Sequence, residues 1–216
     1  NVSKTRNKYA GFFEIQPKPH ENLDIRIAGR FEEYENDSSF DPKISFKYIA
    51  TDKIIIRASK SSSFSMPSMA QMFSSDINLG SVRDFNGASP FVRQAQIGNP
   101  NLKPATSNNF NIGVILRNKN QKISIDYWNI DYKNRIEVQS AQVLLNTDPY
   151  GPSITRNSNG DLIGITTTYF NEESTEVTGV DFKYDTTLFS SIEYGEISLS
   201  INATTLIDFL TPALGN

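Results

Sequence analysis

Apolar and polar residues alternate along most of this chain, a pattern typical of β-strands with one apolar face. In the clearest segment, Leu23, Ile25 and Ile27 occupy alternate positions, and Asp24 and Arg26 stand between them. Successive side chains of a strand point to opposite faces of the sheet. A one-residue shift in pairing would exchange these faces, so the register of such strands is well specified.

The same alternation predicts eight strands, which we expect to form one antiparallel meander. Polar turn residues separate several of them, as at 51–53 and 118–120. The sixth strand is expected to be bent or bulged near Trp128, where the parity of its apolar positions changes. The predicted strands span residues 9–16, 23–34, 43–50, 54–63, 107–116, 122–138, 166–188 and 196–206.

The connections between these strands differ in length in a regular way. Those after the first, third, fifth and seventh strands are short, and those after the second, fourth and sixth are longer. Two of the longer ones are long loops, one of about forty residues after Ser63 and one at 139–163. All short turns then lie at one end of the meander and all long loops at the other. Outer-membrane barrels show this asymmetry, with short periplasmic turns and long extracellular loops.

Strand length and charge placement support a membrane-spanning sheet. Several predicted strands reach the ~9–11 residues that cross a bilayer, whereas strands of globular proteins usually have ~5–6. A Lys or Arg at the bilayer midplane of the outer face costs roughly 2–4 kcal/mol, so we expect Ile25 and Ile27 to face lipid and Arg26 to face away. Aromatic residues near strand ends or bends are expected in the interfacial girdles or, alternatively, as ordinary core or edge residues: Tyr9, Tyr34, Tyr48, Trp128 and Tyr132.

Four segments carry signals more specific than alternation. The predicted hairpin with the Thr51-Asp52 turn leads into R-A-S at 57–59 and F-S-M-P-S at 64–68. The others are G-N-P-N-L-K-P-A-T-S at 98–107, S-I-D-Y-W-N-I-D-Y at 124–132, and the stretch 146–182, which contains R-N-S-N-G and T-G-V-D-F. In this order they resemble the barrel domain of TonB-dependent outer-membrane receptors. Ala105 stands where that family usually has Glu, and Met66 where it often has Ala or Lys.

The resemblance implies an all-β fold, an antiparallel transmembrane β-barrel that is present only in part. About eight strands of a probable 22-stranded barrel are expected, with residues 1–216 in one barrel domain and the plug and remaining strands elsewhere. The implied function is nutrient import across the bacterial outer membrane, powered by TonB through a region outside this chain. Outer-membrane lipid and a siderophore, cobalamin, saccharide or peptide are the implied partners. The alternatives are a small passive eight-stranded barrel and a soluble β-rich carbohydrate-binding module.

Composition excludes several other classes of function. The chain has no cysteine, so a disulfide framework and a thiolate nucleophile are excluded. Its net charge is −3 and its basic residues are scattered, which gives no signal for nucleic-acid binding. The single histidine, His20, lies in a predicted turn and is expected to be exposed. No cofactor, metal or enzymatic motif is predicted.

The remaining candidate chemistry is ligand binding by the two long loops. Both carry mixtures of acidic, basic and aromatic residues that can hydrogen-bond to and stack on a polar ligand. The alternative is that these residues pack the loops together and touch no ligand. The candidates are Asp76, Arg83, Asp84, Phe91 and Arg93 in the loop at 74–96, and Asp148, Tyr150 and Arg156 in the loop at 139–163.

Overall fold

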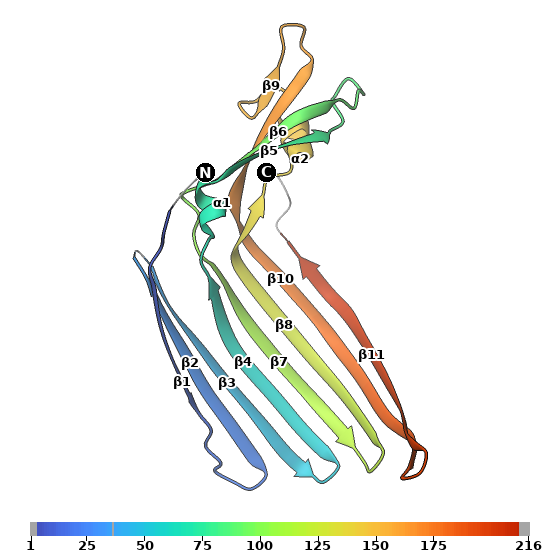
Figure 1. The fold of residues 1–216 in the computed structure, drawn as a ribbon. Coiled ribbons are helices and arrows are strands. Elements are labelled where there is room, and N and C mark those ends of the chain that lie inside the picture. Colours follow the sequence, from blue (N-terminus) through green and yellow to red (C-terminus); the bar gives the residue numbers. More distant parts are fainter. Residues whose placement is uncertain (1–3, 36, 212–216) are drawn as a thin grey trace.

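The computed structural model describes residues 4–35 and 37–211, in which eight strands form one antiparallel meander (Figure 1). The meander is open, with β1 and β11 at its two edges. The predicted number and order of its strands are confirmed. Its members are β1 (Lys8–Ile15), β2 (Leu23–Tyr34), β3 (Ser38–Thr51), β4 (Ile54–Ser65), β7 (Ala105–Arg117), β8 (Gln121–Val138), β10 (Leu162–Ser191) and β11 (Gly195–Leu210).

The two long connections contain regular structure, and the prediction that they are plain loops was wrong. The first holds α1 (Met69–Phe73), β5 (Ser75–Ser81) and β6 (Phe91–Ile97), and the second holds α2 (Ala141–Thr147) and β9 (Ile154–Arg156). β6 pairs in parallel with the start of β10, β5 pairs with β6, and β9 pairs with β10. The local pattern could not reveal this, because the partner that orders β6 lies about seventy residues away.

β10 joins the meander to these added strands. It has 30 residues, which corresponds to a path of roughly 100 Å at the usual rise of a strand. Its first residues pair with β6 and β9, and the rest pairs with β8 and β11. The predicted strand at 166–188 was therefore too short at both ends. In Figure 1 this one strand runs from the loop region down to the short-turn end of the sheet.

Cross-strand register separates the two faces of the meander as the alternation predicts. Ile25 lies opposite Phe46, and Phe46 lies opposite Ala58. The neighbouring row is charged, because Asp24 lies opposite Lys47, which in turn lies opposite Arg57. Phe46 and Ile125 on the apolar face are both 44% exposed. This open apolar surface, opposite a row of charges, is the arrangement expected of a barrel wall. Charged exceptions on the apolar face include Lys60, which lies opposite Ile44 and Phe110, and Glu33, which lies opposite Tyr9.

Three aromatic residues lie on the polar face, so their predicted place in the girdles was wrong. Trp128 lies opposite Asn111, in the row that contains Arg26, and its ring covers Gly179, where a Cβ atom would overlap it. Tyr132 is on the same face of β8. Tyr34 is also on the polar face, where its hydroxyl donates to Glu32. Tyr9 and Tyr48 remain on the apolar face.

Two local predictions fail for identifiable reasons. β8 keeps an unbroken register through Trp128 in both ladders, so the bulge predicted there is absent; the irregular residue is Asn134, with φ 54°. The connection after β2 is short, at residues 35–37, because β3 begins at Ser38. The predicted strand began at Lys43, whereas β3 also includes Pro42, which lies opposite Gly29 of β2. Pro42 cannot donate to a ladder, and the β3–β4 ladder begins one residue later, at Lys43.

Connections of two to seven residues join the strand pairs at one end of the meander, and both long connections lie at the other (Figure 1). His20 is exposed in the β1–β2 connection, as predicted. Among residues 4–35 and 37–211, no helix is long and apolar enough to cross a membrane.

Candidate functional site

The long connections pack into a small unit of their own, which we call the loop subdomain. It consists of β5, β6, β9, α2 and the first residues of β10. Its centre is a buried apolar cluster formed by Val82, Val92, Leu145, Leu162 and Ile165. These five residues come from both connections and from β10, so the cluster fixes the two connections relative to each other. Side chains on this subdomain are therefore presented from a packed support.

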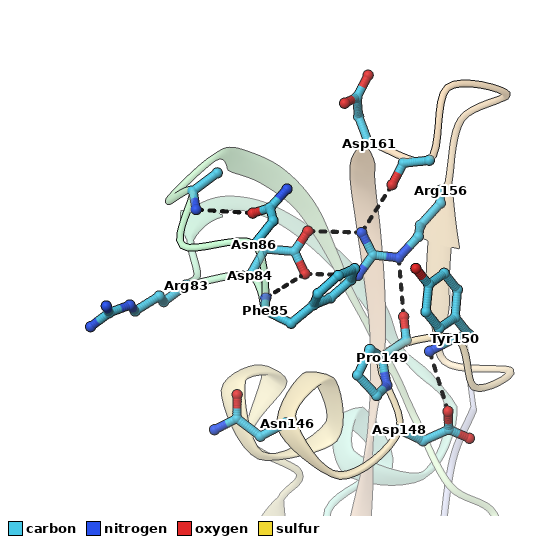
Figure 2. A network of polar contacts seen from close by, with 12 residues as sticks. Arg83, Asp84, Phe85, Asn86, Asn146, Asp148, Pro149, Tyr150, Arg156 and Asp161 are labelled. Carbon is cyan, nitrogen blue, oxygen red and sulfur yellow. Dashed lines mark hydrogen bonds and ion pairs between the residues drawn. The ribbon is translucent and has the colours of Figure 1, made fainter.

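Asp84 and Arg156, both predicted from the sequence, form an ion pair at the centre of a polar network in this subdomain (Figure 2). Arg156 Nη1 and Nη2 each donate to one carboxylate oxygen of Asp84 at 2.8 Å. The remaining Arg156 donors reach backbone carbonyls, with Nε on Pro149 and Nη1 on Gly160, each at 3.1 Å. The side chains of Asp84 and Arg156 are only 2% and 8% exposed. This pair joins the first connection to the second.

The pair shifts the titration of both groups. Hydrogen bonds from the Arg156 guanidinium hold the pKa of Asp84 below its ordinary value, although burial acts in the opposite direction. The same hydrogen bonds raise the pKa of Arg156. Both groups therefore remain charged at neutral pH, and each satisfies the other in a place where an unpaired charge would be costly.

Two exposed aromatic rings flank this buried guanidinium. The rings of Phe85 and Tyr150 lie 4.9 Å and 5.0 Å from the Arg156 guanidinium carbon, close enough for cation–π attraction. Their centroids are 5.7 Å apart, with the rings tilted by 49°. Phe85 is 61% exposed and Tyr150 is 72% exposed. Tyr150 was predicted as a ligand-binding residue and Phe85 was not. The only signal in the sequence for Phe85 was its position next to Asp84.

Two further predicted residues border this aromatic pair. Asp148 accepts a hydrogen bond from the Tyr150 backbone N–H at 3.2 Å, which fixes the turn that presents the ring. The backbone of Arg83 is held by Gln142, whose side chain accepts from its N–H and donates to its carbonyl. The Arg83 side chain points away from the network into solvent (Figure 2).

The last three predicted residues lie on the β5–β6 hairpin, apart from the network. Phe91 and Arg93 share the outer face of β6, and Val92 between them points into the buried cluster. Phe91 is 78% exposed. Asp76 is exposed on the edge strand β5, where it pairs with Gln96 and so lies on the other face of the hairpin. Of the eight candidates, the structure thus gathers Asp84, Asp148 and Tyr150 around Arg156, and Arg83 borders them with its side chain turned away.

Two asparagines that the sequence did not single out fasten the segment at 98–104 to β10. The Asn171 side chain accepts from the Lys103 N–H at 2.7 Å and donates to the carbonyls of Lys103 and Asn134. The Asn99 amide donates to the Tyr169 carbonyl at 2.9 Å. These bonds hold the start of β7 against β10 directly below the loop subdomain.

The site offers hydrogen-bonding groups and aromatic faces, which suit the binding of a polar ligand. In the described part of the chain, no group of three or more His, Cys, Asp or Glu residues is arranged to hold a metal ion.

Comparison with known proteins gives one matching family model and several similar solved structures. The family model described as TonB dependent receptor-like, beta-barrel, matches residues 1–215. Similar solved structures include the siderophore receptor PirA from Acinetobacter baumannii (18% identity, TM-score 0.66, 94% of this chain and 28% of that one). The ferric enterobactin receptor PfeA from Pseudomonas aeruginosa gives 18% identity and a TM-score of 0.68, over 96% of this chain and 28% of that one.

The ferripyoverdine receptor of Pseudomonas aeruginosa is also similar, with 15% identity and a TM-score of 0.52 over 96% of this chain and 24% of that one. At these identities the likeness shows the fold. The chain spans less than a third of the length of each of these receptors. No curated protein matches it.

Proposed function

Because the chain belongs to the TonB dependent receptor-like β-barrel family, we propose that the whole protein is an outer-membrane receptor that imports a scarce polar nutrient. In this proposal residues 1–216 are part of one barrel domain of about 22 strands, with the plug and the other strands outside this chain. Nutrient binds at the extracellular loops, and TonB supplies the energy for its passage.

The loop subdomain is the observation that carries the proposal. A passive pore needs loops only to connect strands, whereas here the loops build a buried cluster and a buried ion pair. Exposed groups on such a rigid support lose little conformational entropy when a ligand binds. A soluble carbohydrate-binding module is disfavoured by the open apolar face of the meander and by the family match.

We assign ligand contact to the exposed candidates and a positioning role to the buried ones. Phe85 and Tyr150 present two aromatic faces. Arg83 adds a charge beside them, and Phe91 and Arg93 add a third ring and a second charge elsewhere on the same subdomain. Asp84 and Arg156 hold the aromatic pair in place. Saccharide, peptide, cobalamin and siderophore ligands all suit such a surface, and a ferric siderophore is the first to test, because the similar structures PirA and PfeA are siderophore receptors.

The test is uptake of ferric siderophores, and then of the other three ligand classes, by cells that express the full-length protein. Uptake is expected to stop when TonB or the proton gradient is removed. Replacing Phe85 and Tyr150 together by Ala should weaken ligand binding while leaving the barrel assembled. Tyr194→Ala is the matched control, since Tyr194 is equally exposed, at 77%, but lies at the short-turn end. Uptake that continues unchanged without TonB would contradict active transport and favour a passive pore.

A further inference from the structure

All three methionines of the chain lie within seven residues, at Met66, Met69 and Met72. They line one cavity of about 240 Å³ between α1, the N-terminal segment and the β2–β3 connection. α1 lies at the loop end of the sheet (Figure 1). All three side chains are half-buried, which leaves the cavity accessible from solvent. Neither the fold nor the proposed nutrient site explains why the methionines gather here.

Local structure fixes the three side chains toward this cavity. Ser68 caps α1, accepting from the Gln71 N–H at 3.1 Å, while the Gln71 side chain accepts from the Ser68 N–H at 2.8 Å. This reciprocal capping holds the short helix in place. Residues three apart share one face of a helix, which aligns Met69 with Met72. Met66 precedes the cap by two residues and reaches the same cavity from the preceding segment.

We propose that Met66, Met69 and Met72 form a three-thioether binding site for a soft monovalent cation, Cu(I). Thioether sulfur is a neutral and polarisable ligand, and it selects Cu(I) over the harder divalent cations. The chain has no cysteine, and its one histidine lies at the other end of the sheet. These methionines are therefore the soft ligands that this part of the protein offers at its solvent-facing loop end.

Charges around the cavity balance, so they do not repel a single positive charge. Lys4 and Arg6 line it together with Glu35 and Asp37. The Arg6 guanidinium donates to Met72 Sδ at 3.1 Å, which shows that this sulfur turns its lone pairs toward a cationic group. Arg6 therefore competes with a bound cation for the Met72 sulfur. If the methionines only fill space between α1 and the sheet, they will bind no metal.

The test uses the full-length receptor in detergent, titrated with Ag(I) as a redox-stable probe and with Cu(I) under reducing conditions. Replacing all three methionines by leucine is expected to lower the number of bound Ag(I) ions by one per protein molecule, and the number of bound Cu(I) ions likewise by one. Met-to-Leu changes keep the side-chain volume and are usually well tolerated, and unchanged heat-modifiability in electrophoresis will confirm that the variant folds. Replacing any one of the three methionines by leucine should weaken Ag(I) binding about tenfold or more. Loss of a residue that only supports a metal ligand already costs about tenfold in affinity, and loss of a ligand should cost at least as much.

Arg6→Gln separates a binding site from simple packing. Removing the competing guanidinium should tighten Ag(I) binding, whereas Zn(II), which prefers thiolate, imidazole and carboxylate ligands, should not compete for the site. The proposal is overturned if the native receptor and the triple leucine variant bind the same number of Ag(I) ions with the same affinity. It is also overturned if Zn(II) displaces Ag(I). The titration requires neither uptake nor TonB. Its outcome therefore tests the methionine site separately from the proposed nutrient site.

Discussion

Arg57 and Asp126 meet across a strand that lies between them. Arg57 is on β4 and Asp126 is on β8, and β7 separates these two strands in the sheet. Arg57 Nε and Nη2 donate to the two carboxylate oxygens at 2.8 and 2.6 Å. The contact passes over Gly113, where a Cβ atom would overlap the Asp126 carboxylate. Gly113 thus lets a paired acid and base lie flat on the polar face.

We predict that Gly113→Ala destabilises the barrel, because the added methyl group displaces the Asp126 carboxylate from Arg57. The expected cost is about 1–3 kcal/mol, the usual range for overpacking. The measurement is the urea midpoint of the full-length protein in detergent. Gly164→Ala is the matched control, since Gly164 is also a buried strand glycine but a Cβ there meets its nearest atom at an ordinary 3.4 Å. Equal midpoints for the two variants would argue against this role of Gly113.

We predict that acid loosens the loop subdomain through Asp84. Its pKa is held below the ordinary value in the folded protein, so its stabilising contribution is fully present above the unfolded pKa of about 4. That contribution is lost as the pH falls through the lowered pKa. A nitroxide attached at Ala88, an exposed position near Asp84, should gain mobility in electron paramagnetic resonance spectra between about pH 5 and 2.

We predict that Asp84→Asn loosens the same subdomain at neutral pH. It leaves the Arg156 guanidinium buried without its counter-charge, and breaking a buried pair in this way costs roughly 3–5 kcal/mol. The nitroxide at Ala88 should then be mobile at pH 7 and lose its acid response. A label at exposed Lys119, at the opposite end of the sheet, is the control and should not change. An acid response that persists in Asp84→Asn would show that another group titrates.

We predict that Asn171→Ala weakens the attachment of the 98–104 segment to β10. The substitution removes three hydrogen bonds to the backbone, for an expected loss of about 1–3 kcal/mol. Hydrogen exchange at Lys103, whose N–H is bound by Asn171, should speed up accordingly. Asn78→Ala, at an exposed position of β5, is the control. Unchanged exchange at Lys103 would mean that Asn99 alone holds the segment.

The sequence predicted the meander well because alternation is a local signal. β2 was predicted at 23–34, the bounds that the structure gives. The prediction of faces failed where an apolar side chain lies on the polar face because it packs against a neighbouring strand. Trp128 covers Gly179 on the neighbouring strand, and this contact was misread as a change in parity. Pairing across strands decides such cases, and one sequence does not display it.

The site was predictable only as a set of loop residues. Asp84 and Arg156 are 72 positions apart and meet because both connections pack on β10. Nothing near either residue in the sequence marks the other as its partner. The same holds for Phe85, which becomes notable only when Arg156 and Tyr150 lie beside it. Residue types indicated binding chemistry, and long-range packing decided which residues are exposed and which are buried.

The central claim is that the meander crosses the outer membrane with the loop subdomain outside, and thiol labelling of intact cells tests it most directly. This chain contains no cysteine, so single cysteines at Ala88, Ser158 and Lys119, all exposed, report cleanly once any cysteines elsewhere in the full-length protein are replaced. An impermeant reagent should label the first two positions, which lie in the loop subdomain, and leave position 119 unlabelled until the cells are lysed. Labelling at 119 with protection at 88 and 158 would contradict the account, because it would place the short turns outside.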